Sequence, residues 1–260
     1  MCTQYSRLKQ PALAPDSVVF AGFGAVGRPR FFTLEDLSAL PQTTRRVTLV
    51  CRHTALNPGR WDTRMWTGVA VADLAAELDV NSSAQSVEVA GYDGSVRSFP
   101  LAKLKDAILA LQGNGQPLTP KEGAPARLIV PGLAACEMPR FVQRVTFRAE
   151  STPETGLFGP IAVFERAEPM ANGLRLHGMA LGAATVVVRR DGGAAVIVPV
   201  VGAAPGLAGR WILAWPDETA ASSMFTVDVA HEALVPEARP VARKWKPRAH
   251  HWTMSGSATL

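Results

Sequence analysis

Cys51 combines reactive chemistry with a position that would hold it rigidly. It follows residues 47–50, Val-Thr-Leu-Val, whose β-branched side chains predict a buried strand, and it precedes a loop marked by Asn57, Pro58 and Gly59. A thiolate at the end of a strand is a sound ligand for a high-valent metal ion. A structural cysteine would show the same pattern, since free cysteines are among the most buried residues. Both interpretations stay open from the residues alone.

His53 lies two residues beyond Cys51. If the strand continues, the two side chains share a face, because side chains alternate along a strand. His53 is then a second candidate at the same site. An isolated histidine is more often an ordinary surface or core residue, and this alternative also stays open.

Three further residues can bind a polar or anionic ligand. Asp93 lies in the turn 91–94, Gly-Tyr-Asp-Gly, and its carboxylate can accept hydrogen bonds from ligand N–H groups, or only shape a hairpin. Arg127 and Arg140 flank the apolar segment 128–130 and the Pro-Gly that follows it. A guanidinium binds phosphate in a bidentate manner, although an ion pair at a strand edge is the alternative for Arg127.

Residues 22–27, Gly-Phe-Gly-Ala-Val-Gly, match the glycine pattern of dinucleotide-binding loops. That loop must open a helix, and Pro29 falls where the second helical turn would need a donor. The next strand ends at Cys51 rather than at an acidic residue. The segment therefore predicts a turn between two strands rather than a nicotinamide site.

Other catalytic signatures are missing from the sequence. It contains no P-loop, no acyl-transfer nucleophile motif and no paired Cys or His zinc pattern. The three cysteines, Cys2, Cys51 and Cys136, are too widely spaced for a disulfide framework. The first 20 residues show no signal peptide, so we expect a cytoplasmic location.

The elements that must position these residues change along the chain. Residues 18–149 predict a mixed α and β domain, with strands at 17–20, 47–50, 86–90, 96–99, 128–130 and 141–147 and helices from Thr33, over 71–78 and over 101–111. Thr33 is a good N-cap, with acidic residues in the first turn after it. Residues 1–17 form a lead-in.

Residues 157–250 predict a small β-sandwich. Strand-like runs recur at 161–164, 174–178, 185–189, 195–201, 211–215 and 224–229, with turn residues between them. Residues 150–156 form a linker, and residues 251–260 form a tail. The pair His250 and His251, where the tail begins, is expected to be exposed. The fold class is therefore α+β, with a mixed domain followed by an all-β domain.

Composition narrows the function. The chain has 260 residues, of which 47% are hydrophobic and 19% charged, which allows a real core. No apolar run is long enough to span a membrane. The formal charge of +5 suits an anionic ligand, and without a dense basic stripe it does not indicate a nucleic-acid partner.

Several short segments agree in order and spacing with one known family. They are Phe-Thr-Leu-Glu-Asp-Leu-Ser-Ala-Leu-Pro (32–41), Thr-Leu-Val-Cys (48–51), Trp-Thr-Gly-Val (66–69), Gly-Tyr-Asp-Gly (91–94), Asn-Gly-Gln-Pro-Leu (114–118), Gly-Ala-Pro-Ala-Arg-Leu-Ile-Val-Pro-Gly (123–132) and Arg-Phe-Val-Gln-Arg-Val (140–145). Together they resemble the molybdopterin domain of the sulfite oxidase family. Many members carry an immunoglobulin-like sandwich after it, which residues 157–250 resemble.

The resemblance implies a molybdenum cofactor and assigns roles to the candidate residues. Cys51 would be the protein ligand to molybdenum, Asp93 would contact the pterin, and Arg127 would neutralise the cofactor phosphate. Arg140 takes the place of a family lysine beside the cofactor, and His53 would compensate for a missing Gly-Asn. The implied activity is oxidation or oxygen-atom transfer on a small anionic substrate, with a separate electron acceptor.

The sequence also departs from the family pattern. Glu122 replaces a histidine and would repel a phosphate, and Glu137 replaces a basic residue near the substrate. A degenerate homologue that has lost the cofactor and acts as a binding or assembly module is therefore the alternative. The resemblance further implies a homodimer through the sandwich, which Trp211 and Trp215 would support if they are exposed.

Overall fold

The structure is a computed structural model that describes residues 18–51, 55, 57–153, 159–217, 220, 223–229 and 243–245. The chain divides into two compact units. Unit 1 comprises Met1–Leu49 and Thr63–Leu157, and unit 2 comprises Val50–Asp62 and Phe158–Leu260. The short segment Val50–Asp62, and Cys51 with it, thus groups with unit 2, whereas the sequence pattern ran it into the first domain.

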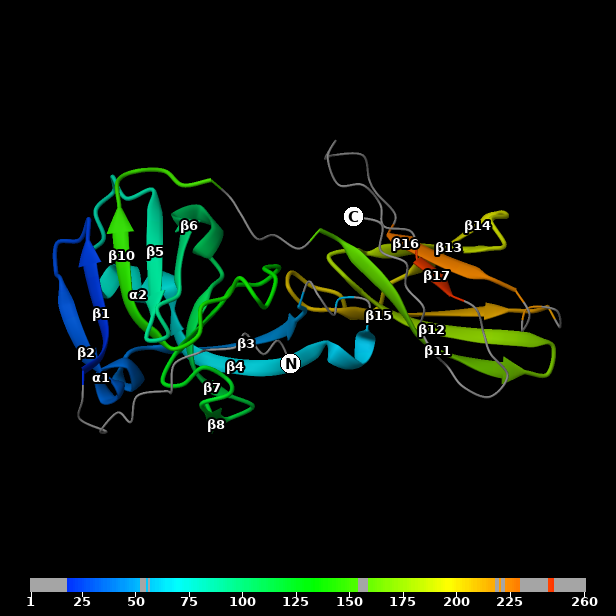
Figure 1. The fold of residues 1–260 in the computed structure, drawn as a ribbon, viewed down its shortest axis with the longest axis horizontal. Helices are drawn as coiled ribbons and strands as arrows, with labels where there is room; N and C mark the ends of the chain where they lie inside the picture. Colours follow the sequence, from blue (N-terminus) through cyan, green and yellow to red (C-terminus); the bar gives the residue numbers. More distant parts are fainter. Residues whose placement is uncertain are drawn as a thin grey trace. The chain divides into compact units, whose positions relative to one another are not determined.

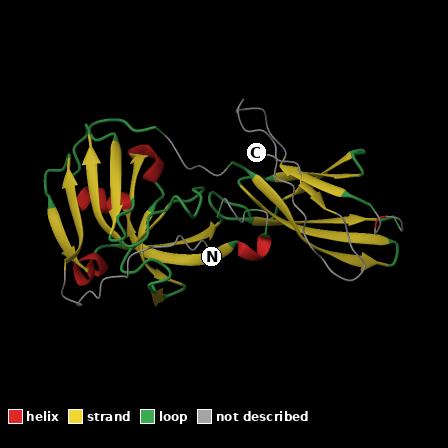
Figure 2. Ribbon diagram, in the orientation of Figure 1, coloured by secondary structure: helices red, strands yellow, loops and turns green. Residues whose placement is uncertain are grey.

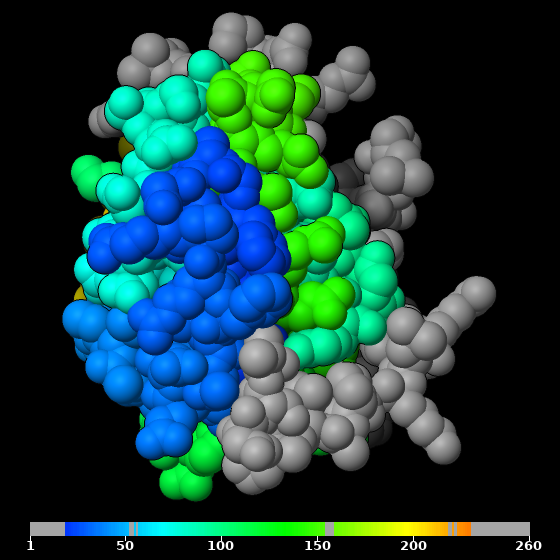
Figure 3. All heavy atoms as spheres, turned by 90° about the vertical axis from the view of Figure 1, so that its left-hand side faces the viewer, coloured from blue at the N-terminus to red at the C-terminus, as the bar shows by residue number. Residues whose placement is uncertain are grey.

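Unit 1 is built around a five-stranded sheet in the order β2-β1-β10-β5-β6 (Figure 1). The strands are β1 (Val18–Gly24), β2 (Arg30–Thr33), β5 (Ser86–Gly91), β6 (Val96–Pro100) and β10 (Val142–Arg148). β1 and β10 pair in parallel and the other neighbours are antiparallel. Figure 3 shows one face of this unit, where the blue surface of β1 and β2 borders the green surface of β10.

A second sheet of unit 1 carries the order β3-β4-β7-β8, and β9 also pairs with β7. Its strands are β3 (Gln42–Leu49), β4 (Asp62–Ala70), β7 (Ile108–Gly113), β8 (Gln116–Pro117) and β9 (Arg127–Ile129). The helix expected over 101–111 is wrong. A short 3₁₀ turn, η3 (Leu101–Leu104), leads instead into β7. β7 pairs on both edges and its residues 108–111 are all buried, so its apolar run lacks the alternation that marks a strand.

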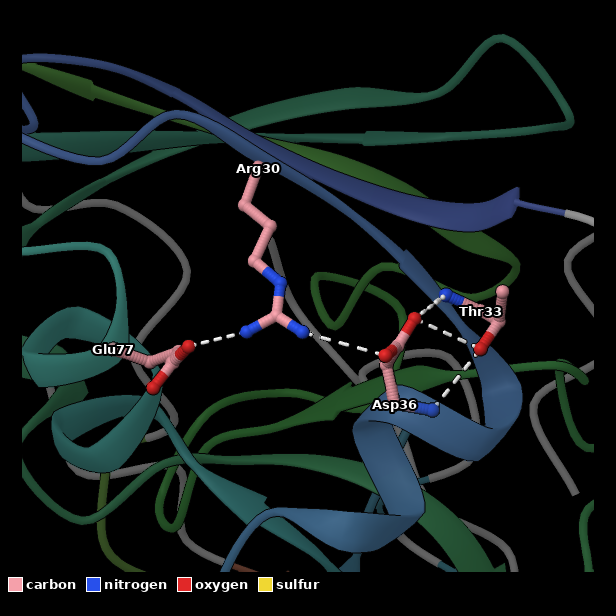
Figure 4. A network of polar contacts seen from close by, with 4 residues as sticks. All are labelled: Arg30, Thr33, Asp36 and Glu77. Atoms are coloured by element: carbon pink, nitrogen blue, oxygen red, sulfur yellow. Dashed lines mark hydrogen bonds and ion pairs between the residues drawn. The ribbon is translucent and has the colours of Figure 1, made fainter.

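Two short helices complete unit 1 (Figure 2). Thr33 caps α1 (Leu34–Ala39) as expected: its hydroxyl accepts from the Asp36 N–H at 3.0 Å, and Asp36 accepts in return from the Thr33 N–H at 2.8 Å. These hydrogen bonds from Thr33 hold the pKa of Asp36 below its usual value. Arg30 of β2 bridges Asp36 and Glu77 of α2 (Val71–Glu77), as Figure 4 shows. One arginine thereby links both helices to the sheet edge.

The glycine-rich segment 22–27 lies between two antiparallel strands and opens no helix, as expected, but its first three residues complete β1 and only the turn to β2 follows Gly24. β1 runs into antiparallel β2, and no helix starts after the glycines. Gly22 leaves room for the side chain of Leu78, which would overlap a Cβ there. Gly24 has a φ of +95° and lies against the Phe147 carbonyl, so a side chain would be strained. Packing and turn geometry account for both glycines.

The core of unit 2 is built from β-strands, as the sequence predicted. One sheet has the order β11-β12-β15 and the other β14-β13-β16-β17. The strands are β11 (Ile161–Met170), β12 (Gly173–Leu181), β13 (Thr185–Arg190), β14 (Ala195–Pro199), β15 (Gly209–Trp215), β16 (Phe225–Val229) and β17 (Arg243–Trp245). The immunoglobulin-like assignment of this unit stays a prediction.

The core of unit 2 draws on both of its sheets. Phe164, Leu176, Val188, Trp211 and Phe225 are all buried in one cluster. Trp211 is only 1% exposed, and Trp215 is partly buried against Phe225. These tryptophans therefore belong to the core, and the homodimer that they would have supported stays a prediction. No helix in the described part of the chain is long and apolar enough to cross a membrane.

Candidate functional site

The loop between β8 and β9, residues 118–126, organises the candidate site in unit 1. Thr119 donates through its backbone N–H and its hydroxyl to Oε2 of Glu122, at 2.8 and 2.7 Å. Arg64 of β4 forms an ion pair with Oε1 of the same carboxylate. Burial acts to raise the pKa of Glu122, but the hydrogen bonds from Thr119 and Arg64 outweigh it and lower that pKa. Glu122 is therefore a firmly bound carboxylate whose charge is matched by Arg64.

Arg127 is the first residue of β9 and is only 6% exposed. Its Nη1 donates to the Glu122 carbonyl at 3.2 Å, and its guanidinium carbon lies 5.5 Å from the ring centre of Trp66. The five donors of the group allow it to hold the loop and bind an anion together.

Arg140 lies two residues before β10, which begins at Val142, and it is only 5% exposed. Its Nη1 donates to the Lys121 carbonyl at 3.3 Å. Gly123, with a φ of +109°, packs against it: a Cβ at this glycine would lie 2.7 Å from the Cβ of Arg140. The loop thus contacts both arginines through consecutive carbonyl groups and through a glycine that leaves no room for a side chain.

Asp93 lies in the hairpin turn between β5 and β6. Its Oδ1 accepts from the N–H of Ser95 at 3.1 Å and from the Ser95 hydroxyl at 2.6 Å. The same turn meets the Arg140 segment, because the Tyr92 N–H donates to the Phe141 carbonyl at 2.8 Å. The structure therefore brings Asp93, Arg127 and Arg140 to one connected set of loops. Asp93 shapes its own turn, and its contact with a pterin stays a prediction.

Cys51 belongs to unit 2, whereas these three residues belong to unit 1. It is 7% exposed, carries a thiol and follows the last residue of β3 by two positions. Its segment belongs to unit 2, where Val50, Ala55 and Trp61 join a small apolar cluster. Its role as a metal ligand stays a prediction, and His53 lies outside the described residues.

Sequence reasoning missed the partner of Glu122. Arg64 lies 58 positions from Glu122, and no local pattern indicates that β4 delivers it to the loop. The sequence holds one clue, the carboxylate of Glu122 beside Lys121 and Gly123. Glu137, the second acidic departure, likewise has a basic partner, because Arg97 lies 3.4 Å from it.

The described residues fit an anionic cofactor at this loop. Two buried guanidinium groups are held on neutral carbonyls, and a glycine packs closely against one of them. The indole N–H of Trp66, buried beside Arg127, has no hydrogen-bond partner in the described part of the chain. A buried donor of this kind beside two arginines is available to a polar ligand. No cluster of three His, Cys, Asp or Glu side chains that could hold a metal ion occurs among the same residues.

Comparison with known proteins places this geometry in a family. The model described as the oxidoreductase molybdopterin binding domain matches residues 8–155. An uncharacterized oxidoreductase, YuiH of Bacillus subtilis, is 27% identical over 152 residues, which cover 58% of this chain and 74% of that protein. The mitochondrial sulfite oxidase of Rattus norvegicus is 28% identical over 174 residues, covering 56% and 32%.

Two further comparisons show how much of each relative the chain covers. An NADH nitrate reductase of Volvox carteri is 31% identical over 153 residues, which cover 47% of this chain and only 18% of that protein. The chain therefore spans a small part of the nitrate reductase and about a third of the sulfite oxidase. The crystal structure of the sulfane dehydrogenase SoxCD from Paracoccus pantotrophus has a TM-score of 0.71 over 85% of this chain and 68% of that one, at 24% identity. The fold is shared with that structure. On the match of its family model, the chain belongs to the family of oxidoreductases with a molybdopterin binding domain.

Proposed function

We propose that this chain is a molybdopterin-dependent oxidoreductase of the sulfite oxidase type. Its reaction is a two-electron oxidation or an oxygen-atom transfer on a small anionic substrate, with electrons passed to a separate acceptor. The observation that carries the proposal is the pair of buried arginines, Arg127 and Arg140, held on the carbonyls of residues 121 and 122. Arginine side chains are rarely buried to this degree, and here two of them are buried at one loop.

Each arginine has a distinct task in this proposal. Arg127 binds the cofactor phosphate through its guanidinium group, which lies over the Trp66 ring. Arg140, from the segment beside the Asp93 turn, holds positive charge where an anionic substrate approaches. When bound, the cofactor supplies a molybdenum centre that exchanges two electrons with the substrate. Asp93 would orient the pterin by accepting from its N–H groups.

Cys51 would supply the protein thiolate for the metal. The residue is only 7% exposed, and the strand β3 that precedes it limits its movement. A thiolate binds a metal only when deprotonated, so we expect metal retention to weaken as the pH falls.

The test is metal and pterin content of protein expressed in a host that makes the cofactor. We expect about one molybdenum and one pterin per chain, with metal lost in Cys51→Ser and both lost in Arg127→Met. Arg148→Gln is the matched control, because Arg148 is an exposed arginine of the same unit that pairs with Glu88. Elemental analysis and fluorescence of the oxidised pterin measure the two components separately.

The second candidate is a folded homologue that binds no cofactor and acts as a binding or assembly module. The observation that favours it is Glu122, a carboxylate within the loop that would meet the cofactor phosphate. It predicts folded wild-type protein with neither metal nor pterin from the same host. That result would reject the oxidoreductase proposal, and metal retained in Cys51→Ser would reject the assignment of the ligand.

A further inference from the structure

Glu122 contacts two arginines through two different groups. Its carboxylate pairs with Arg64, and its backbone carbonyl accepts from Arg127 at 3.2 Å. The carbonyl of the preceding residue, Lys121, accepts from Arg140 at 3.3 Å. The orientation of two buried guanidinium groups therefore depends on where the backbone at residues 121 and 122 is held.

Local hydrogen bonds alone give this loop only a turn. The N–H groups of Glu122, Gly123 and Ala124 all donate to the Thr119 carbonyl, at 2.9, 3.1 and 3.1 Å. These bonds, and those from Thr119 to the Glu122 carboxylate, close the turn on itself. They set its shape. Backbone hydrogen bonds attach the loop to the strands beside it, because the N–H groups of Phe141 and Val142 donate to the carbonyls of residues 123 and 126, but none of these bonds is made by Glu122.

Arg64 adds a side-chain attachment at Glu122 itself, from a regular strand. It lies in β4, which pairs with β7, and its side chain is only 20% exposed where it meets the 15% exposed side chain of Glu122. Its guanidinium carbon lies 5.9 Å from the Trp66 ring centre, the same ring against which Arg127 packs. An ion pair that is partly buried and stacked in this way keeps a defined geometry, unlike an exposed pair.

We propose that Arg64 and Glu122 are a positioning pair that fixes the loop 118–126 so that Arg127 and Arg140 face the ligand. This inference rests on the proposed function, since it takes the two arginines as the cofactor-binding groups. Neither residue of the pair needs to touch the cofactor. A Glu at position 122 is then a fixed part of the site, held by Arg64, rather than a charge directed at the phosphate.

The test uses Arg64→Met, Glu122→Gln, the double variant and Arg64→Lys, with Arg148→Gln as the control. Cofactor content per chain is one readout, and amide hydrogen exchange of Gly123 and Ala124 in cofactor-free protein is the other. We expect each single variant to lose about tenfold in cofactor content, as is typical when a supporting contact is removed. The exchange of the two amides should accelerate while the amides of β5 and β10 stay protected.

Two comparisons separate positioning from general destabilisation. The double variant should be no worse than either single variant, because the two residues act as a unit, and Arg64→Lys should restore part of the loss. Cofactor content at the wild-type level in both single variants, or strictly additive losses, would overturn the inference and leave the proposed function intact. Wild-type protein without cofactor would instead reject the proposed function, and the exchange data would then decide the positioning role alone: unchanged exchange in Arg64→Met rejects it.

Discussion

Two tryptophans, Trp66 in unit 1 and Trp211 in unit 2, are equally buried but differ in their neighbours. Each is 1% exposed, and neither indole N–H has a hydrogen-bond partner within the described residues. Trp211 lies edge-on to Phe164, with ring centres 5.2 Å apart, in a cluster of apolar side chains. Trp66 lies instead beside the guanidinium groups of Arg64 and Arg127.

The difference separates a packing region from a binding region. Burying cations is costly, so an apolar core excludes them, as the core around Trp211 does. The arginines around Trp66 are retained because the Glu122 carboxylate pairs with Arg64, the Glu122 carbonyl accepts from Arg127, and the indole face lies near both. Burial of an aromatic side chain alone does not indicate a binding site, whereas buried charged side chains beside it do.

The largest expected effect lies in the packing region. Gly178→Ala should destabilise unit 2 by about 3 kcal/mol, because a Cβ there would overlap the Trp211 ring and the Val163 carbonyl, and neither has room to move. Chemical denaturation followed by tryptophan fluorescence measures the change. A variant as stable as the wild type would contradict the rigid packing described for this core.

The tryptophans themselves give a paired experiment of intermediate size. Trp211→Phe should lower the free energy of unfolding by about 2 kcal/mol with no loss of bound cofactor beyond the unfolded fraction. Trp66→Phe should lower cofactor content severalfold, because phenylalanine lacks the N–H and binds a cation more weakly. Denaturation and pterin fluorescence are recorded on both variants, and the same ratio of the two effects in each would remove the distinction between the regions.

The pH dependence of stability should also differ between the regions. The folded-state pKa of Glu122 is lowered from 4.5, so its contribution is present above that value and is lost as the pH falls through the folded pKa. The difference in melting temperature between wild type and Glu122→Gln should therefore be largest near neutral pH and shrink in acid. Trp211→Phe is the control, and its difference should not follow that titration.

The smallest effect is expected for an arginine that stacks on an aromatic ring away from the loop. Arg30 lies 4.8 Å from the Phe32 ring centre and bridges Asp36 and Glu77, but it is 43% exposed (Figure 4). Arg30→Gln should cost about 0.5 kcal/mol, since solvent screens exposed pairs, and should leave cofactor content unchanged. Thermal unfolding and metal analysis check both statements, and a tenfold loss of metal would show that stacked arginines matter regardless of place.

Much of the fold follows from local sequence, because local interactions produced it. Thr33 and Asp36 form their capping box within three residues, and Gly91–Gly94 closes a hairpin between neighbouring strands. Gly24, with its positive φ, ends β1 before the turn that leads to β2. The order of the family segments also lies in the sequence, and it indicated the molybdopterin family before any contact was known.

Only the tertiary structure decided the features that depend on residues far apart in the sequence. Residues 108–111 form a strand because β4 and β9 pair with both edges of β7, which no local preference records. Arg127 and Arg140 were candidates by type, but their burial and their shared loop emerge only when β9 and β10 are in place. The pairing of Arg64 with Glu122 joins residues 58 positions apart, and a contact at that separation is set by the packing of sheets rather than by neighbouring residues.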